Sequence, residues 1–119
     1  MLQDFSYTGT LTNTPVLITE NFKTGTAYLV WADGFNRKNV HDTYIQLFDA
    51  QSTSDVTLGT TDPILTFPLP LRGAHDWQLP VNDYFQGKKF KHGVVAAATQ
   101  ERKGTTAPDN AVDVNFIFV

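Results

Sequence analysis

The chain has 119 residues, of which 41% are hydrophobic and 13% aromatic, and its formal net charge is -3. This length fits one domain with a core of its own, and the weak negative charge gives no electrostatic support for a nucleic-acid partner. The chain has no cysteine, which excludes disulfides, thiolate metal sites and cysteine nucleophiles.

The first segment of the chain, MLQDFSYTGTLTNT at 1–14, has few apolar groups in any regular spacing. It has no basic region followed by an apolar run, so we expect neither a signal peptide nor a membrane anchor. No later run approaches the roughly 20 apolar residues that span a bilayer. We predict that residues 1–14 form an arm that crosses onto an adjacent subunit, and that residues 15–119 form a single β-sandwich domain.

Short alternating runs follow this arm, and no window shows the spacing of an amphipathic helix. PVLITE at 15–20 and TAYLVWADGF at 26–35 are predicted strands. In the second run we expect the Asp-Gly pair at 33–34 to form a turn, because this dipeptide is a strong turn signal. Trp31 and Phe35 would then flank that turn.

The middle of the chain combines β-forming residues with a long polar connection. TYIQLFD at 43–49 is a predicted strand, and the residues at 51–62 are mostly small and polar. We expect the hydroxyl and Asp groups of this connection to bond the backbone locally and to order the loop. ILTFPLPL at 64–71 contains Pro68 and Pro70, which indicates either a strand at the edge of a sheet or a strand that ends in an extended segment.

The last third of the chain carries the clearest strand signals. GKKFKHG at 87–93 is typical of a hairpin rim in which Lys protects a sheet edge. VVAAATQ at 94–100 contains small apolar residues, as expected of a central strand. AVDVNFIFV at 111–119 has the cleanest alternation, with Val112, Val114, Phe116 and Phe118 on one side of the strand. In that final run Asp113 and Asn115 lie on the side opposite the apolar groups. About seven or eight short strands predict an all-β fold, an antiparallel β-sandwich of jelly-roll-like form.

Candidate reactive groups are few and scattered. A zinc site would need three histidines to converge, namely His41, His75 and His92. The His75-Asp76 pair could orient an imidazole, but no serine lies on a nucleophile-elbow pattern. Three carboxylates could offer oxygen ligands to calcium, but their spacing suits turns better: Asp49, Asp55 and Asp62. We predict no enzymatic activity, no metal and no cofactor.

Aromatic residues carry the strongest functional signal. The chain has nine Phe, four Tyr and two Trp, which is more than a core of this size needs. One interpretation buries all of them, a second places some at a contact with other chains, and a third makes Trp31, Trp77 and Tyr84 a platform for sugar rings. For the second interpretation the predicted interface residues are Leu2, Phe5, Tyr7, Trp31, Phe35, Arg37, Trp77, Tyr84 and Phe85.

Two long segments resemble small virion structural proteins of tailed bacteriophages. They are YIQLFDAQSTSDVTLGTTDPILTFPLP and VVAAATQERKGTTAPDNAVDVNFIFV, and the resemblance runs from Asn39 to Val119. The segment RGAHDWQLPVNDYFQGKKFKHG departs from it by being longer and more aromatic. The resemblance implies a β-sandwich without catalytic residues, and either of two roles for it. One is a decoration or cement protein, often a homotrimer, that binds the major capsid protein on the outer surface of the head. The other is a neck or tail component that binds a receptor or a carbohydrate.

Overall fold

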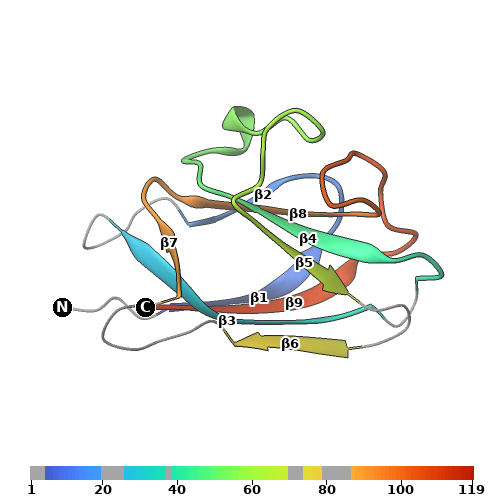
Figure 1. Ribbon diagram of the computed structural model, residues 1–119, viewed down its shortest axis with the longest axis horizontal. Helices are drawn as coiled ribbons and strands as arrows, with labels where there is room; N and C mark the ends of the chain where they lie inside the picture. The colour runs from blue at the N-terminus through green and yellow to red at the C-terminus, as the bar shows by residue number, and fades with distance from the viewer. Residues whose placement is uncertain (1–4, 20–25, 37–38, 70–73, 79–86) are drawn as a thin grey trace.

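Nearly all of the regular structure is β-strand. The structure, a computed structural model, describes residues 5–19, 26–36, 39–69, 74–78 and 87–119 (Figure 1). None of the described residues belongs to a helix long and apolar enough to cross a membrane. The elements in chain order are β1 (Phe5–Leu11), β2 (Val16–Thr19), β3 (Ala27–Phe35), β4 (Thr43–Phe48), the 3-10 turn η1 (Thr53–Asp55), β5 (Leu65–Leu69), β6 (Ala74–Gln78), β7 (Lys88–Phe90), β8 (Val94–Thr99) and β9 (Val112–Phe118).

The strands form two antiparallel sheets that pack face to face (Figure 1). One sheet has the order β1-β9-β3-β6, with the short β7 also paired to β3, and the other has the order β2-β8-β4-β5. The chain passes repeatedly between the two layers, and this order is that of a jelly roll. The predicted all-β, jelly-roll-like sandwich is therefore confirmed. Sequence analysis did not assign a strand at β6, which pairs with residues 31–35 of β3.

Strict alternation in β9 builds the centre of the core. Its four inward-facing apolar side chains, Val112, Val114, Phe116 and Phe118, are at most 2% exposed and belong to the main cluster between the sheets. Asp113 is exposed on the other side, as predicted. All six residues of β8 are buried, which fits its place between β2 and β4. The predicted edge strand is also confirmed, because β5 ends its sheet and carries the exposed Pro68.

Residues 5–11 differ from the arm that was expected over residues 1–14. They form β1, which pairs with β9 along seven consecutive residues from Phe5 to Leu11. Leu11 is fully buried in the main cluster, and Tyr7 packs against the same cluster from its margin. This segment therefore belongs to the sandwich of its own chain, because its alternate residues cover the core.

The Asp-Gly pair at 33–34 also differs from expectation, because it lies inside β3 and forms no turn. Both residues pair with β6 on one side and with β9 on the other. A Cβ atom at Gly34 would lie 2.8 Å from Leu69 Cδ2 of the opposite sheet and 3.2 Å from the Asp113 main-chain oxygen. The glycine is needed because the layers approach closely here, and not because the chain reverses.

The polar connection after β4 covers the outer face of the four-stranded sheet. A second apolar cluster lies beneath it, formed by Phe48, Ala50, Val56 and Val95, with Leu17 and Leu58 packed against it. Main-chain bonds within the connection order it: Asp55 N–H donates to Ser52 O, and the N–H groups of Thr60 and Thr61 both donate to Thr57 O. A local bond between a hydroxyl and the backbone, as expected from the small polar residues, is present at Thr61, whose Oγ1 accepts the N–H of Thr57 (2.9 Å). The loop acts as a third layer over the sheet (Figure 1).

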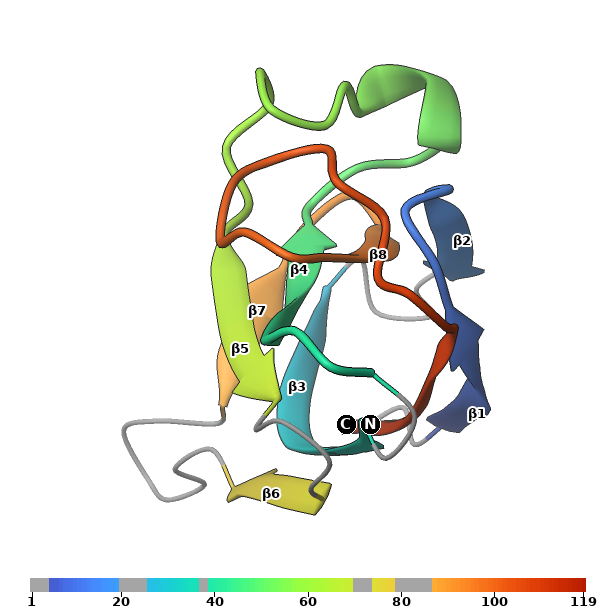
Figure 2. The same cartoon turned by 90° about the vertical axis from the view of Figure 1, so that its right-hand side faces the viewer.

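A second loop covers the rest of that outer face. Gln46, fully buried in β4, donates from Nε2 to Thr99 Oγ1 (2.6 Å) and lies 3.4 Å from the main-chain oxygens of Glu101 and Gly104. The Arg102 guanidinium carbon lies 5.0 Å from the centre of the ring of Tyr44. The four-stranded sheet is therefore covered on both sides, by the other sheet and by these two loops (Figure 2).

Candidate functional site

The outer face of the five-stranded sheet differs from that of the four-stranded sheet, because it carries exposed hydrophobic side chains. Its central strands present polar and aromatic side chains outward, since the alternate positions of β3 and β9 face the core. Phe35 and Ile117 are 40% and 38% exposed. We call this surface the β3–β9 face and define it by Thr8, Trp31, Asp33, Phe35, Asn115 and Ile117.

A chain of hydrogen bonds crosses the β3–β9 face from β3 to β1. Trp31 Nε1 donates to Asp33 Oδ2 (3.0 Å), and Asn115 Nδ2 donates to the same oxygen (3.4 Å). Thr8 Oγ1 in turn donates to Asn115 Oδ1 (2.9 Å). The bonds join three strands that are far apart in sequence, and they hold the indole in a fixed orientation on the sheet.

This arrangement suits recognition of another molecule. Trp31 lies directly opposite Ile117 in the register, so an aromatic and an aliphatic side chain share one half-exposed area. Large aromatic groups held in place by polar neighbours are the usual anchors of protein interfaces. Three large hydrophobic side chains of the described residues are exposed, and two of them, Phe35 and Ile117, lie here.

The predicted interface residues divide into three groups. Trp31 and Phe35 lie together on the β3–β9 face, two positions to either side of Asp33. Tyr7 differs from expectation, because it lies on the inner side of β1 and its ring stacks on Phe116 with centroids 6.2 Å apart. The side chains of the other predicted residues lie outside the described part of the structure: Leu2, Phe5, Arg37, Trp77, Tyr84 and Phe85.

Sequence reasoning missed four members of the face, Thr8, Asp33, Asn115 and Ile117. The outward positions of Asn115 and Ile117 follow from the alternation of β9, but alternation alone assigns no role to the outward side. Asp33 was assigned to a turn. The proximity of Asp33 to Asn115 depends on the β3–β9 register, which no local pattern specifies.

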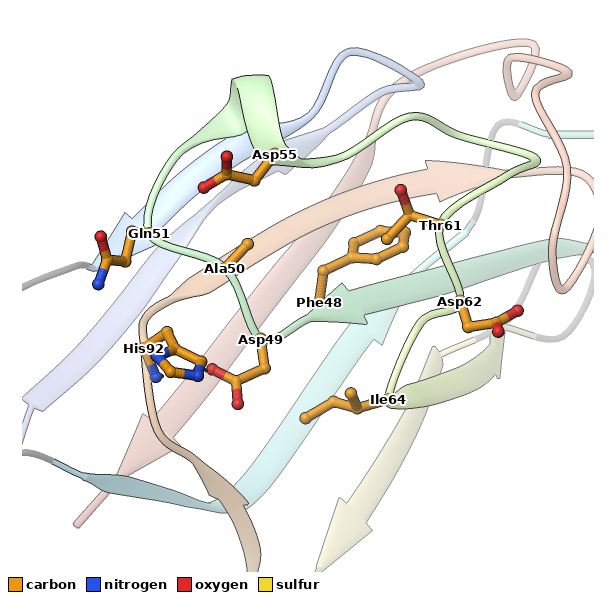
Figure 3. A pocket seen from close by; sticks show the side chains of 9 residues that line it. All are labelled: Phe48, Asp49, Ala50, Gln51, Asp55, Thr61, Asp62, Ile64 and His92. Carbon is orange, nitrogen blue, oxygen red and sulfur yellow. Dashed lines mark hydrogen bonds between the residues drawn. The ribbon is translucent and has the colours of Figure 1, made fainter.

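A hollow of about 250 Å³ lies at the end of β4, under the polar connection (Figure 3). Phe48 and Ile64 contribute its apolar wall, and its rim carries the three carboxylates considered above, Asp49, Asp55 and Asp62, together with His92. Within the described residues, no three metal-ligating side chains come close enough to hold an ion. The carboxylates are instead engaged by the protein itself.

Asp49 has the clearest structural role of the three. Its Oδ1 accepts the N–H groups of His92 (2.8 Å), Lys91 (3.1 Å) and Gly93 (3.4 Å), which fixes the turn between β7 and β8. Asp62 forms an ion pair with Lys103 (2.5 Å), and Asp55 accepts a long bond from Ser52 Oγ (3.4 Å). Asp49 therefore has the turn-stabilising role that the sequence favoured.

Replacing Asp49 by alanine is expected to lower the free energy of unfolding by about 1–2 kcal/mol, because three N–H groups lose a charged acceptor. The matched control is Asp55→Ala, which removes a carboxylate from the same hollow but only one long bond, so we expect a change within about 0.5 kcal/mol. Urea unfolding followed by circular dichroism measures both values. Equal losses in the two variants would contradict the structural role of Asp49.

The histidines do not form a common site within the described residues. His41 Nδ1 lies 3.0 Å from Asp109 Oδ2, and the N–H of Val40 donates to the same oxygen (3.3 Å). His92 lies at the hollow, and the side chain of His75 is outside the described part. The exposed His41–Asp109 pair joins the segment before β4 to the segment before β9, which is a structural contact between loops.

This contact predicts a measurable pH dependence. The hydrogen bond with His41, followed by the N–H of Val40, holds the pKa of the Asp109 carboxyl below its ordinary value. Because the pKa is lower in the folded chain than in the unfolded chain, the contact stabilises the fold above the ordinary pKa of about 3.9. That contribution is lost as the pH falls through the folded value.

A carboxyl NMR titration tests this directly. In His41→Ala the pKa of Asp109 is expected to rise toward its ordinary value, because the main cause of the lowering is gone. Val40→Ala is the matched control: it keeps the main-chain donor, so the pKa of Asp109 should stay as in the parent protein. An unchanged pKa in His41→Ala would show that this hydrogen bond does not form in solution.

Comparison with known proteins adds no relative. No protein-family model, no curated protein and no solved structure matches this chain. A function is therefore inferred from the fold, from the β3–β9 face and from the short motifs of the sequence.

Proposed function

We propose that this chain is a structural protein of a tailed-bacteriophage particle. In this proposal it is a decoration or cement protein that binds the major capsid protein on the outer surface of the head and carries out no reaction. The segments from Asn39 onward resemble such proteins, and the fold is of the class that the resemblance implies. Jelly rolls are common among capsid proteins.

The observation that carries the proposal is the difference between the two sheets. The four-stranded sheet has an apolar outer cluster, and two loops of the chain cover it. The five-stranded sheet presents Trp31 on its outer side, with the half-exposed Phe35 and Ile117 beside it. A fixed indole between apolar neighbours and a polar network is what a stable contact with another protein requires.

The direct test uses the phage particles whose genome encodes the chain. Mass spectrometry of purified particles is expected to find the protein, and electron cryo-microscopy is expected to place it on the head with the β3–β9 face against the major capsid protein. Particles that contain no copy of the chain would refute the proposal. Density for the chain at the neck or tail of the particle would instead support the alternative role.

A second candidate function is carbohydrate or receptor binding by a neck or tail component. One observation favours it: the hydrogen-bonded set Trp31, Asp33 and Asn115 combines an indole with carboxylate and amide oxygens on one exposed sheet. Sugar rings stack on indoles and use such oxygens as hydrogen-bond acceptors. A glycan array separates the two functions, since a cement protein should bind no glycan.

A further inference from the structure

The four sheet edges of the sandwich are not equally protected against pairing with another chain. Exposed edges invite strand addition, and proteins usually block them with Pro, charged residues, bulges or short strands. Three edges carry such devices. In the four-stranded sheet the edge strand β5 contains Pro68, and β2 has four residues and a register shift after Leu17. At the end of the five-stranded sheet opposite β1, the five-residue strand β6 contains Asp76, and β7 presents the exposed Lys88 and Lys89.

β1 is the edge without such a device. Its sequence, FSYTGTL, has seven residues, no charge and no Pro. It pairs with β9 without a register shift, and no other described strand pairs with its second edge. Figure 2 shows β1 at the margin of the five-stranded sheet. A regular, uncharged edge of this length is a template for a further strand.

We propose that this edge pairs with β1 of a second copy of the chain, antiparallel, about a two-fold axis at Thr8. The register that pairs all seven residues of β1 with their symmetry mates places Ser6 opposite Thr10 and Tyr7 opposite Gly9. An isologous contact of this kind requires a self-complementary surface. β1 meets that requirement, since no charged groups face one another in this register.

The side chains on both faces of β1 fit this pairing. On the outer side are Ser6, Thr8 and Thr10, all exposed, and hydroxyl pairs across strands are favourable. On the inner side the Tyr7 ring already leans over Gly9, with its hydroxyl oxygen 2.7 Å from the place where a Cβ atom would stand. In the pair each Tyr7 faces the Gly9 of the other copy, which leaves room for the two rings.

The consequence is a continuous sheet through two copies, with the two β3–β9 faces on the same side of it. Thr8 is both the centre of the two-fold pairing and a member of that face, through its bond to Asn115. This two-fold pair is an alternative to the homotrimer that the phage resemblance implies. The pairing depends only on β1, so its test is independent of any test of capsid binding.

The experiment compares two double variants that differ at one position. Ser6→Glu/Thr10→Lys places opposite charges across the two-fold axis, whereas Ser6→Lys/Thr10→Lys places like charges there. In both, the lysine introduced at position 10 faces Asp113 of the same chain, so the effect of that lysine on folding is matched. Circular dichroism and thermal melting confirm that each variant is folded.

Light scattering over a dilution series, with sedimentation, measures the mass. The parent protein and Ser6→Glu/Thr10→Lys are expected to be dimers, and Ser6→Lys/Thr10→Lys is expected to dissociate with a Kd raised at least about ten-fold. A monomeric or trimeric parent protein, or equal Kd values for the two variants, would overturn the pairing. Binding to phage heads is a separate measurement, so failure here is distinguishable from failure of the proposed function.

Discussion

Replacing Phe116 by alanine is expected to lower the free energy of unfolding by about 3–5 kcal/mol, the usual cost of emptying a large aromatic site in a core. Phe116 is fully buried at the centre of β9. Its ring stacks on Tyr7 at 6.2 Å and meets Phe118 edge-on at 6.5 Å, measured between ring centroids. Its neighbours lie on paired strands, so they fill the space left by the ring only in part.

This loss is large because domains are stable by only about 5–15 kcal/mol. The matched control is Ile117→Ala, on the same strand but on the outer side, where the side chain is 38% exposed. We expect this variant to lose about 1 kcal/mol or less of its free energy of unfolding, since the Ile117 side chain is already partly in contact with water in the folded protein. Chemical unfolding of both variants gives the two values, and similar losses would contradict the placement of Phe116 between the sheets.

Replacing Trp31 by alanine is expected to weaken binding to phage heads by about 30-fold or more, equivalent to the loss of about 2 kcal/mol at an interface anchor. The indole lies opposite Ile117, and its N–H is bonded to Asp33 Oδ2 at 3.0 Å, so its orientation is set before binding. Asp33→Ala should weaken binding to a smaller extent, because the indole remains but loses this restraint.

The control for Trp31→Ala is Val40→Ala. Val40 is 55% exposed, the most exposed large hydrophobic side chain of the described residues, and it does not belong to the β3–β9 face. Its removal should leave binding unchanged. A co-sedimentation assay with heads that lack the chain measures the affinities, and thermal melting confirms folding. Equal effects of the two substitutions on binding would contradict the proposal that the β3–β9 face is the contact surface.

The core was largely predictable from the sequence, because its signals are local. The alternation of Val112 to Phe118 and the small apolar run of β8 gave the correct buried residues, and Pro68 marked an edge strand. In such strands the side-chain period alone decides which residues face the core.

β1 and the β3–β9 face were not predictable in the same way, because they depend on pairings between distant residues. FSYTGTL contains a glycine and several hydroxyl residues, so its alternation is weak without β9 beside it. Asp33 and Asn115 are 82 positions apart in the chain, and Thr8 and Asn115 are 107 apart. The Asp-Gly pair in β3 has the composition of a turn, and tertiary contacts override that preference.

The place of β9 between β1 and β3 also limits how fast this protein can fold. β1 and β9 are about a hundred residues apart in the chain, and β1 has no other described strand partner, whereas β3 also pairs with β6 and β7. Contacts of such wide sequence separation slow the search for the native state, and β-sandwiches of this kind fold in about milliseconds to seconds. The five-stranded sheet is therefore joined into one piece only when β9 pairs with both β1 and β3.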